Sequence, residues 1–286
     1  MSLVRSDGSE TILPKDTVTM DLPVNPFKTL LASRRPAFGV WASFPSAATV
    51  EALAHSPYDW MLIDTEHAPV DLDTLHGQLQ AAGNGLCLPV VRPAWSDRIL
   101  IKRLLDIGVQ NFMLPMIDSP EQAMDAVGYV RYPPRGVRGI AGATRASRYG
   151  RVERYLQQAD AQIAVLAQIE SPQAVGQAAA IAGVEGVDGL FIGPNDLAAS
   201  LGYPGELRHP AVTHAIARVI DSVRPVGKTI GILAANVEDA AHYLGAGVTL
   251  IACGSDVRLL TRGADDMARR LQLLVQPALA AGVGDA

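Results

Sequence analysis

The chain has 286 residues, a length that fits one large domain or two small ones. Hydrophobic residues make up 49% of it and charged residues 19%, which excludes an intrinsically disordered chain. The formal net charge of −5 argues against a nucleic-acid-binding protein, because such a protein has to neutralise phosphates with basic side chains.

Nothing in the sequence predicts export or insertion into a membrane. The first twenty residues contain no apolar run long enough for a signal peptide. No stretch reaches the ~18 consecutive apolar residues that a membrane span needs. Cys87 and Cys253 both lie in apolar runs, so we expect buried thiols rather than a disulfide or a zinc site. The sequence therefore predicts a soluble, cytoplasmic protein.

Eight short apolar runs, bounded by Gly, Pro, Asp or Asn, predict strands that are buried on both faces. They are Phe38–Ser43, Trp60–Asp64, Cys87–Arg92, Asn111–Met116, Gln162–Ile169, Asp188–Ile192, Thr229–Ala234 and Val248–Cys253. Amphipathic or alanine-rich segments between them predict helices, several of which open at Ser or Asn and close at Gly. The last helical pattern is the longest and begins at Asp256.

Eight strand–helix units over about 250 residues predict a single-domain (β/α)8 TIM barrel of the α/β class. We place the barrel at residues 27–286 and regard residues 1–26 as an N-terminal extension. An open doubly wound sheet is the alternative fold. It usually carries a glycine-rich turn after its first strand, and Phe38–Ser46 contains no such turn.

One connection, residues 117–161, is too long for a simple strand–helix unit. Part of it is helical, and the remainder is a loop rich in Gly and Arg. Seven arginines lie between Arg131 and Arg154, with Glu153 as the only acidic residue. A long loop in a compact domain is usually either functional or disordered.

Ionisable side chains follow four of the predicted strands, at the barrel end where active sites lie. They are Asp64, Glu66 and His67 after the second strand, Arg92 at the end of the third, Glu170 after the fifth and Asp196 after the sixth. Each also has a plainer interpretation. The carboxylates can cap helices, which we favour for Glu66, and Arg92 and His67 can make ordinary surface pairs or loop hydrogen bonds. For Trp41, at the end of the first strand, we favour packing.

Taken together, these residue types have a chemical logic. Glu170 and Asp196 can hold a hard divalent cation such as Mg²⁺ or Mn²⁺. The planar guanidinium of Arg92 suits a bidentate carboxylate, and His67 can transfer a proton near neutral pH. This combination favours enolate chemistry on a 2-oxo acid, with the cation as a Lewis acid.

The strings LIDTEHAP, VVRP, PRGVRG, QIES and GPNDL occur in this order. They resemble the HpcH/HpaI aldolases, class II pyruvate aldolases typified by 4-hydroxy-2-oxoheptanedioate aldolase and 2-dehydro-3-deoxyglucarate aldolase. The resemblance covers roughly Phe27 to Val275. It implies a TIM barrel whose C-terminal helix is exchanged between subunits, in a homohexamer built as a trimer of dimers. It also implies reversible cleavage of a 4-hydroxy-2-oxo acid into pyruvate and an aldehyde, through a metal-bound pyruvate enolate, with Mg²⁺, Mn²⁺ or Co²⁺ as cofactor.

Matching the motifs assigns roles to individual residues. The resemblance implies that His67 is the base with Asp64 close to it, that Arg92 binds pyruvate, and that Glu170 and Asp196 ligate the metal. Gln168, Trp41, Asn195 and Leu233 are the further substrate-binding candidates. Asp106 is matched to an aspartate that partners the catalytic histidine across a subunit contact, although in this sequence it lies at a helix end. Two departures, Thr65 where Gly is common and Asn195 where a small residue is common, concern fine specificity.

Other functions stay open to different degrees. A class I aldolase needs a lysine at the barrel mouth to form a Schiff base. None of the four lysines, at positions 15, 28, 102 and 228, follows a predicted strand. A lyase like citrate lyase β or malyl-CoA lyase remains an alternative, as does a non-catalytic metabolite-binding barrel.

The aldehyde partner is not defined by these motifs. Arg145 or Arg148 of the long loop can meet a distal carboxylate, such as that of succinic semialdehyde. The same arginines can instead form salt bridges between subunits.

Overall fold

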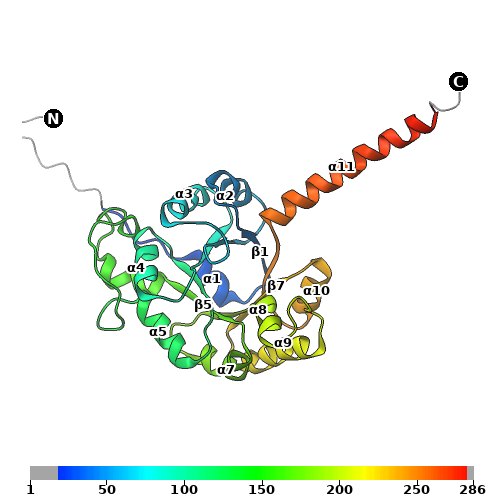
Figure 1. Cartoon of the computed structure of the whole chain (residues 1–286). Coiled ribbons are helices and arrows are strands. Elements are labelled where there is room, and N and C mark those ends of the chain that lie inside the picture. Colours follow the sequence, from blue (N-terminus) through cyan, green and yellow to red (C-terminus); the bar gives the residue numbers. More distant parts are fainter. Residues whose placement is uncertain (1–18, 282–286) are drawn as a thin grey trace, which may run out of the picture.

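Eight parallel strands close into a barrel in which each strand pairs with the next along the chain and β8 pairs with β1 (Figure 1). This computed structural model describes residues 19–281, with side chains described as far as residue 274. Residues 1–18 of the predicted extension therefore lie outside the described part. The predicted TIM barrel is confirmed, and the alternative of an open doubly wound sheet is wrong.

All eight predicted strands are present, and their ends differ from the expected ones by at most two residues. The strands are β1 (Ala37–Ala42), β2 (Trp60–Asp64), β3 (Leu88–Arg92), β4 (Asn111–Leu114), β5 (Ala164–Ile169), β6 (Gly189–Ile192), β7 (Thr229–Ala234) and β8 (Leu250–Ser255). The helices of the described residues are α1 (Pro26–Ser33), α2 (Ala47–Ala54), α3 (Leu72–Ala82), α4 (Arg98–Asp106), α5 (Pro120–Val130), α6 (Tyr155–Gln158), α7 (Pro172–Gly183), α8 (Pro194–Ser200), α9 (Pro210–Val223), α10 (Val237–Gly245) and α11 (Asp256–Ala281). Short 3-10 helices are η1 (Arg145–Ser147), η2 (Ala159–Gln162) and η3 (Arg224–Val226).

The strands are apolar on both faces because each face packs against a different part of the core. Inward-facing side chains, among them Trp60, Leu166 and Phe191, fill the barrel as a packed cluster. Outward-facing side chains such as Val40 and Ile63 belong to the cluster beneath the surrounding helices. This double burial explains why the strands appear in the sequence as nearly continuous apolar runs.

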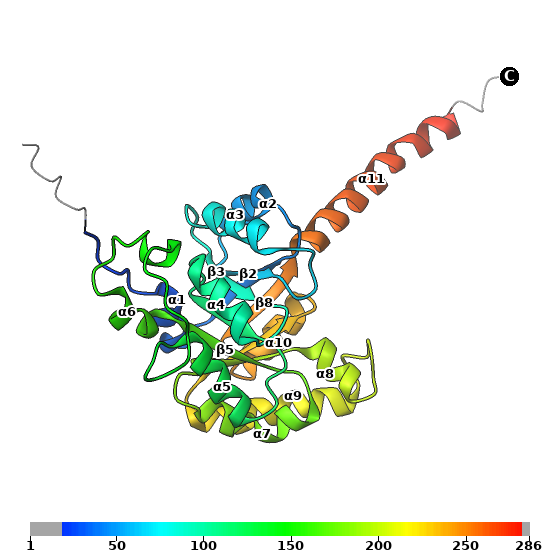
Figure 2. The same ribbon diagram turned by 60° about the vertical axis from the view of Figure 1, so that its left-hand side comes forward.

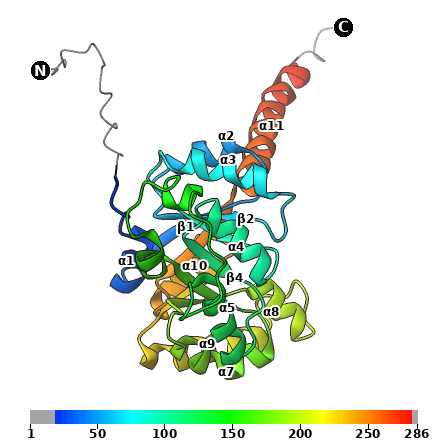
Figure 3. The ribbon, with the colours of Figure 1, turned by 90° about the vertical axis from the view of Figure 1, so that its left-hand side faces the viewer.

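Helix α1, which is not among the predicted elements, closes the N-terminal end of the barrel. The Asn25 side chain caps this helix by accepting a hydrogen bond from Phe27 N, and its Nδ2 donates to Asn111 Oδ1 over 2.7 Å. Phe27 is fully buried and packs on Trp60, with 6.4 Å between the ring centroids. Figure 3 shows α1 and α8 at opposite ends of the barrel. Because α1 covers one end, only the C-terminal end of the strands can form an open mouth.

The long arginine-rich connection lies at the same end of the barrel as α1 (Figure 2). It has a small core of its own, in which the fully buried Arg138 guanidinium lies over the rings of Tyr132 and Tyr155, at 4.4 and 5.7 Å from their centroids. Such cation–π contacts stabilise a desolvated guanidinium. At least this arginine of the loop is therefore structural.

Helix α11 projects away from the barrel (Figure 1). Several of its apolar side chains are exposed in the single chain, including Leu260, Met267, Leu271 and Leu274. Within residues 19–281, no helix is both long and apolar enough to cross a membrane. Cys87 and Cys253 are free thiols, as predicted; Cys87 is buried, whereas Cys253 is only half-buried, so the predicted burial is confirmed for Cys87 alone.

Replacement of Gly39 by Ala is expected to destabilise the barrel. A Cβ atom at this position of β1 would collide with the buried Trp60 ring, which has no room to move. Overpacking of this kind costs about 1–3 kcal/mol. Urea unfolding measures the effect as a lower midpoint at unchanged slope.

The matched control is Gly77→Ala in helix α3, where nothing lies within 4 Å of the added Cβ. Alanine is the better helix former there, so this variant should gain about 0.4–1 kcal/mol. Equal midpoints for the two variants would contradict the packing that we describe around Trp60.

Candidate active site

A cavity of about 380 Å³ opens at the C-terminal ends of the strands. The predicted site residues that line it are Trp41, Asp64, His67, Arg92, Gln168, Asn195, Asp196 and Leu233. Glu170 is 3% exposed and lies directly beside Gln168, whose Nε2 contacts its carboxylate. The structure thus brings together every predicted site residue except Asp106.

Asp64 holds Arg92 by a bidentate contact in the floor of this cavity. Arg92 Nε donates to Asp64 Oδ1 over 3.0 Å, and Nη2 donates to Oδ2 over 2.7 Å. Trp41 Nε1 donates to Asp64 Oδ2 over 3.3 Å, and the Trp41 ring lies 5.2 Å from Arg92 Cζ. Burial works against ionisation of Asp64, but the hydrogen bonds and charge of Arg92 lower its pKa below the ordinary value. This contact fixes the guanidinium plane, and Nη1 is the one guanidinium nitrogen that Asp64 does not contact.

Glu66 is not a helix cap, and the interpretation favoured from the sequence is wrong. Its Oε2 lies 3.0 Å from Arg92 Nη1 and 3.8 Å from His67 Nε2. Burial raises the pKa of Glu66, while the charges of Arg92 and His67 oppose the rise. Arg92 is thus held between two carboxylates. The sequence did not indicate the contact with Glu66, because it shows Glu66 only as a neighbour of His67.

His67 lies at the rim of the cavity with 63% of its side chain exposed. The turn that presents it is shaped by Asp64, whose Oδ1 accepts hydrogen bonds from Glu66 N and His67 N over 3.0 and 3.4 Å. The imidazole is therefore open to a ligand in the cavity, while its backbone is tied to the residue that orients Arg92.

Glu170 directly follows β5, and Asp196 lies in the first turn of α8, which follows the neighbouring strand β6. Glu170 Oε2 accepts a hydrogen bond from Met116 N over 3.0 Å. Met116 has a φ of 55°, a left-handed conformation that is uncommon for a residue with a side chain. Burial, together with the negative charges of Asp196 and Glu66, raises the pKa of Glu170 to about 7, although the hydrogen bond from Met116 N opposes the rise.

These features fit a hard divalent cation. The negative charges that raise the pKa of Glu170 are neutralised when a divalent cation binds between neighbouring carboxylates. Gln168 Oε1 is a further oxygen donor, buried without a hydrogen-bond partner among the described residues. Gly193 allows the close approach of β6, because a Cβ there would lie 2.7 Å from Glu170 Oε1. In the described part of the chain, no group of three or more His, Cys, Asp or Glu side chains is placed to hold a metal ion, so water and substrate would complete the coordination around Glu170 and Asp196.

Asp106 lies apart from the cavity within one subunit. It is the last residue of α4, at the end of the barrel that α1 covers, and its Oδ1 is 3.8 Å from Arg138 Nη2. Burial raises the pKa of Asp106, and the charges of Arg138 and Lys102 oppose the rise. Any contact between Asp106 and a histidine of the cavity would have to come from another subunit.

The loop arginines do not reach the cavity of their own subunit. Arg145 Nη1 donates to Ile107 O over 2.7 Å, and Arg145 and Arg148 line a different cavity beside Pro89 and Gln110. Those two residues lie at the N-terminal ends of β3 and β4. Within one subunit, the hypothesis that Arg145 or Arg148 meets the distal carboxylate of a substrate is therefore wrong.

Arg258 lines the cavity although it is not among the predicted site residues. It follows β8 by three residues, so the rule that barrel sites lie at the C-terminal ends of strands would have found it. Arg258 was overlooked because it lies in the long amphipathic pattern that begins at Asp256, where an arginine is expected on the exposed face of a helix.

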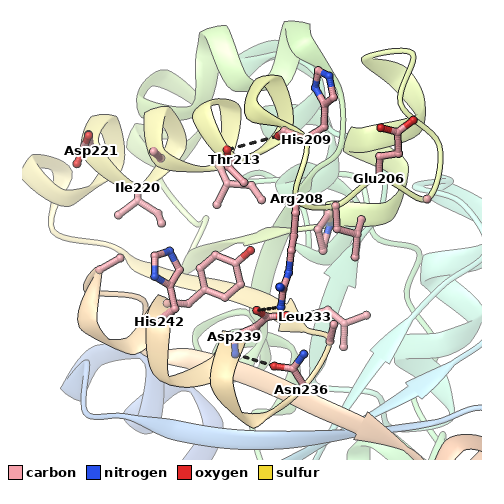
Figure 4. A pocket seen from close by; sticks show the side chains of 18 of the residues that line it. Glu206, Arg208, His209, Thr213, Ile220, Asp221, Leu233, Asn236, Asp239 and His242 are labelled. Carbon is pink, nitrogen blue, oxygen red and sulfur yellow. Dashed lines mark hydrogen bonds and ion pairs between the residues drawn. The ribbon is translucent and has the colours of Figure 1, made fainter.

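A second and larger cavity, of about 860 Å³, lies between α9 and α10 (Figure 4). It shares Pro194, Leu207, Leu233 and Ala235 with the first cavity. Several of its polar and charged side chains are engaged in local structure: Arg208 pairs with Asp239 over 3.3 Å, Arg224 with Asp221 over 3.6 Å, and His209 Nδ1 accepts a hydrogen bond from the first turn of α9. The smaller cavity, with its paired carboxylates and fixed guanidinium, is therefore the candidate active site.

Comparisons with known proteins extend over the whole barrel. The model of the family described as HpcH/HpaI aldolase/citrate lyase matches residues 37–263. A pyruvate aldolase of Rhizobium etli is 47% identical over 251 residues, which are 88% of this chain and 99% of the relative. A 4-hydroxy-2-oxo-heptane-1,7-dioate aldolase of Escherichia coli is 46% identical over 247 residues, 86% and 94% of the two chains. The crystal structure of an HpcH/HpaI aldolase/citrate lyase family protein from Burkholderia cenocepacia has a TM-score of 0.85 and 41% identity, and covers 87% of this chain and 100% of its own.

Proposed function

Because this chain belongs to the HpcH/HpaI aldolase/citrate lyase family, we propose that it is a class II pyruvate aldolase. It would cleave a 4-hydroxy-2-oxo acid reversibly into pyruvate and an aldehyde. The observation that carries the proposal is the meeting of Arg92, His67 and the Glu170–Asp196 carboxylate pair at one barrel mouth. A citrate-lyase-like reaction is not favoured, since the relatives that match most of the chain are named aldolases.

We propose Glu170 and Asp196 as the ligands of a divalent cation, with Mg²⁺, Mn²⁺ and Co²⁺ as candidates. When bound, such a cation supplies Lewis acidity toward the oxygens of a 2-oxo acid. The buried Gln168 lies beside this pair and can contact the same substrate oxygens. Trp41, Asn195 and Leu233 form the wall on which the remainder of the substrate would rest.

Arg92 would bind the carboxylate of the 2-oxo acid through its Nη1/Nη2 edge, in place of the Glu66 carboxylate that lies 3.0 Å from Nη1. Its Nε/Nη2 edge is already occupied by Asp64, so the guanidinium cannot rotate away when the ligand arrives. A donor pair that is held in place before binding loses little conformational entropy on binding. Asp64 is in this account the positioning residue of Arg92.

His67 would exchange the proton of the substrate's C4 hydroxyl. In the cleavage direction it removes this proton as the C3–C4 bond breaks, and the electron pair of that bond passes to the enolate of pyruvate. In the synthetic direction it returns the proton to the new alkoxide. Its exposed imidazole at the rim of the cavity is compatible with both steps.

We also propose that the protein assembles into a homo-oligomer through α11, and that this oligomer is a hexamer. The apolar side chains that α11 exposes in the single chain favour burial against another copy. Sedimentation velocity tests the assembly, and a monomer at micromolar concentration would contradict it. In such an assembly Asp106 of one subunit would pair with His67 of another.

The central experiment is exchange of the methyl protons of pyruvate with deuterated solvent, followed by mass spectrometry. A pyruvate aldolase should catalyse the exchange without an aldehyde, lose it in EDTA and regain it with added Mn²⁺. A metabolite-binding barrel should neither exchange protons nor respond to the metal.

Replacement of Arg92 by Lys should weaken binding of the 2-oxo acid, although the charge is retained. Lysine lacks the planar pair of donors and leaves the buried Asp64 without its bidentate partner. We expect kcat/KM to fall about 10- to 100-fold, as for loss of a hydrogen bond to a charged group. The exposed Arg103→Lys on α4 is the control. An unchanged KM for the 2-oxo acid in Arg92→Lys would reject Arg92 as its anchor.

A further inference from the structure

We infer that Arg258 selects aldehydes that carry a negatively charged group, such as a terminal carboxylate. The inference rests on the proposed aldolase function and adds a residue that determines specificity for the aldehyde partner. It depends on the place of Arg258 in the cavity, on the anchoring of its backbone and on its freedom from ion pairs.

Arg258 and Arg92 are the two arginines that line the active-site cavity. Arg92 is held at the floor by Asp64, whereas Arg258 is an exposed residue on the first turn of α11 at the rim. Apolar side chains, Phe191 and Leu233 among them, line the same cavity. A substrate bound at Arg92 by its 2-oxo acid end would therefore extend past an apolar wall toward a second guanidinium.

Hydrogen bonds attach the backbone that carries Arg258 to the segment that follows β1. The carboxylate of Asp256 is 5% exposed and accepts hydrogen bonds from Ser43 N and Phe44 N, over 3.0 and 2.9 Å, just after β1 ends. Ser255 Oγ accepts a hydrogen bond from Arg258 N over 3.2 Å. The first turn of α11 is thus anchored at the mouth even though the rest of the helix projects outward.

Arg258 is available for a ligand. It has no acidic side chain within 4.0 Å among the described residues, whereas Asp64 and Glu66 already hold Arg92. Aspartate and glutamate side chains gather on the floor of the site and repel an anionic chain end. The rim is therefore the place where a negative group on the aldehyde is stabilised, through charge-assisted hydrogen bonds to the guanidinium.

The test compares two aldehydes of equal chain length in aldol addition to pyruvate: succinic semialdehyde, which carries a carboxylate, and butanal, which carries none. We expect the wild-type enzyme to prefer succinic semialdehyde. In Arg258→Gln the ratio of the two kcat/KM values should fall about tenfold, allowing for the exposure of the contact. Arg258→Lys, which keeps the charge, should retain part of the preference.

The matched control is Arg262→Gln, one helical turn further along α11 and outside the lining of the cavity. It should leave the aldehyde ratio unchanged. If Arg258→Gln lowers both kcat/KM values by the same factor, or leaves both unaltered, the role of Arg258 is overturned while the aldolase function stands. If the wild type exchanges no pyruvate protons and adds neither aldehyde, the proposed function itself is overturned.

Discussion

Glu170→Gln and Asp196→Asn are each expected to reduce aldol cleavage about 1,000-fold. Lewis-acid stabilisation by a bound metal is worth several kcal/mol, and each 1.4 kcal/mol is about a factor of ten in rate. An amide in place of either carboxylate removes the negative charge that attracts a hard cation. In Glu170→Gln only one of the two oxygens that accept hydrogen bonds, from Met116 N and from Gln168 Nε2, is retained.

The readout has two parts, activity and metal affinity. Steady-state cleavage rates are measured over a series of Mn²⁺ concentrations, and excess metal should restore part of the activity of both variants. Calorimetric titration with Mn²⁺ should show weaker binding in each. Glu206→Gln makes the same chemical change at an exposed position between α8 and α9, and it should behave as wild type. Full activity of the wild type after exhaustive EDTA treatment would refute the metal-dependent mechanism.

His67→Ala is expected to lower aldol cleavage by about 10²–10⁴-fold, the usual cost of losing a positioned general base. Metal affinity should be nearly intact, because Glu170 and Asp196 are unchanged. Decarboxylation of oxaloacetate also produces the enolate of pyruvate but requires no removal of a hydroxyl proton. It should therefore survive the substitution better than cleavage does.

The decisive quantity is the ratio of cleavage to decarboxylation in the variant and in the wild type. His55→Ala removes another exposed histidine, directly after α2, and should alter neither activity. If His67→Ala lowers both activities equally, or loses its metal, His67 is not the specific base of the cleavage reaction.

The strands and most of the site were predictable because both follow from short-range patterns. A strand buried on two faces has to be apolar at nearly every position, and all eight strands stand out for that reason. Polar groups directly after such a run are conspicuous, and parallel strands bring their C-terminal ends to one mouth. Asp64, Arg92, Glu170 and Asp196 were identifiable on this basis alone.

Only the tertiary structure decided which of these groups hold one another. The bidentate contact of Asp64 with Arg92, the approach of Glu66 to both Arg92 and His67, and the orientation of Met116 N toward Glu170 depend on side-chain directions at the ends of different strands. Sequence position places a residue at the mouth but does not specify its partner there. Glu66 was misinterpreted for this reason.

The N-terminal end of the barrel and the rim of the mouth also depend on contacts that the sequence does not specify, here between residues far apart in the chain. Helix α1 closes the barrel through Asn25, whose partner Asn111 is 86 residues away. Asp256 anchors α11 to Ser43 across 213 residues, and so brings Arg258 to the rim. The sequence by itself determined the barrel and the residues that follow its strands, because local burial and strand direction dictate them. The structure decided the closure of one end, the anchoring of α11 and the placement of the loop arginines, because these depend on contacts between distant segments.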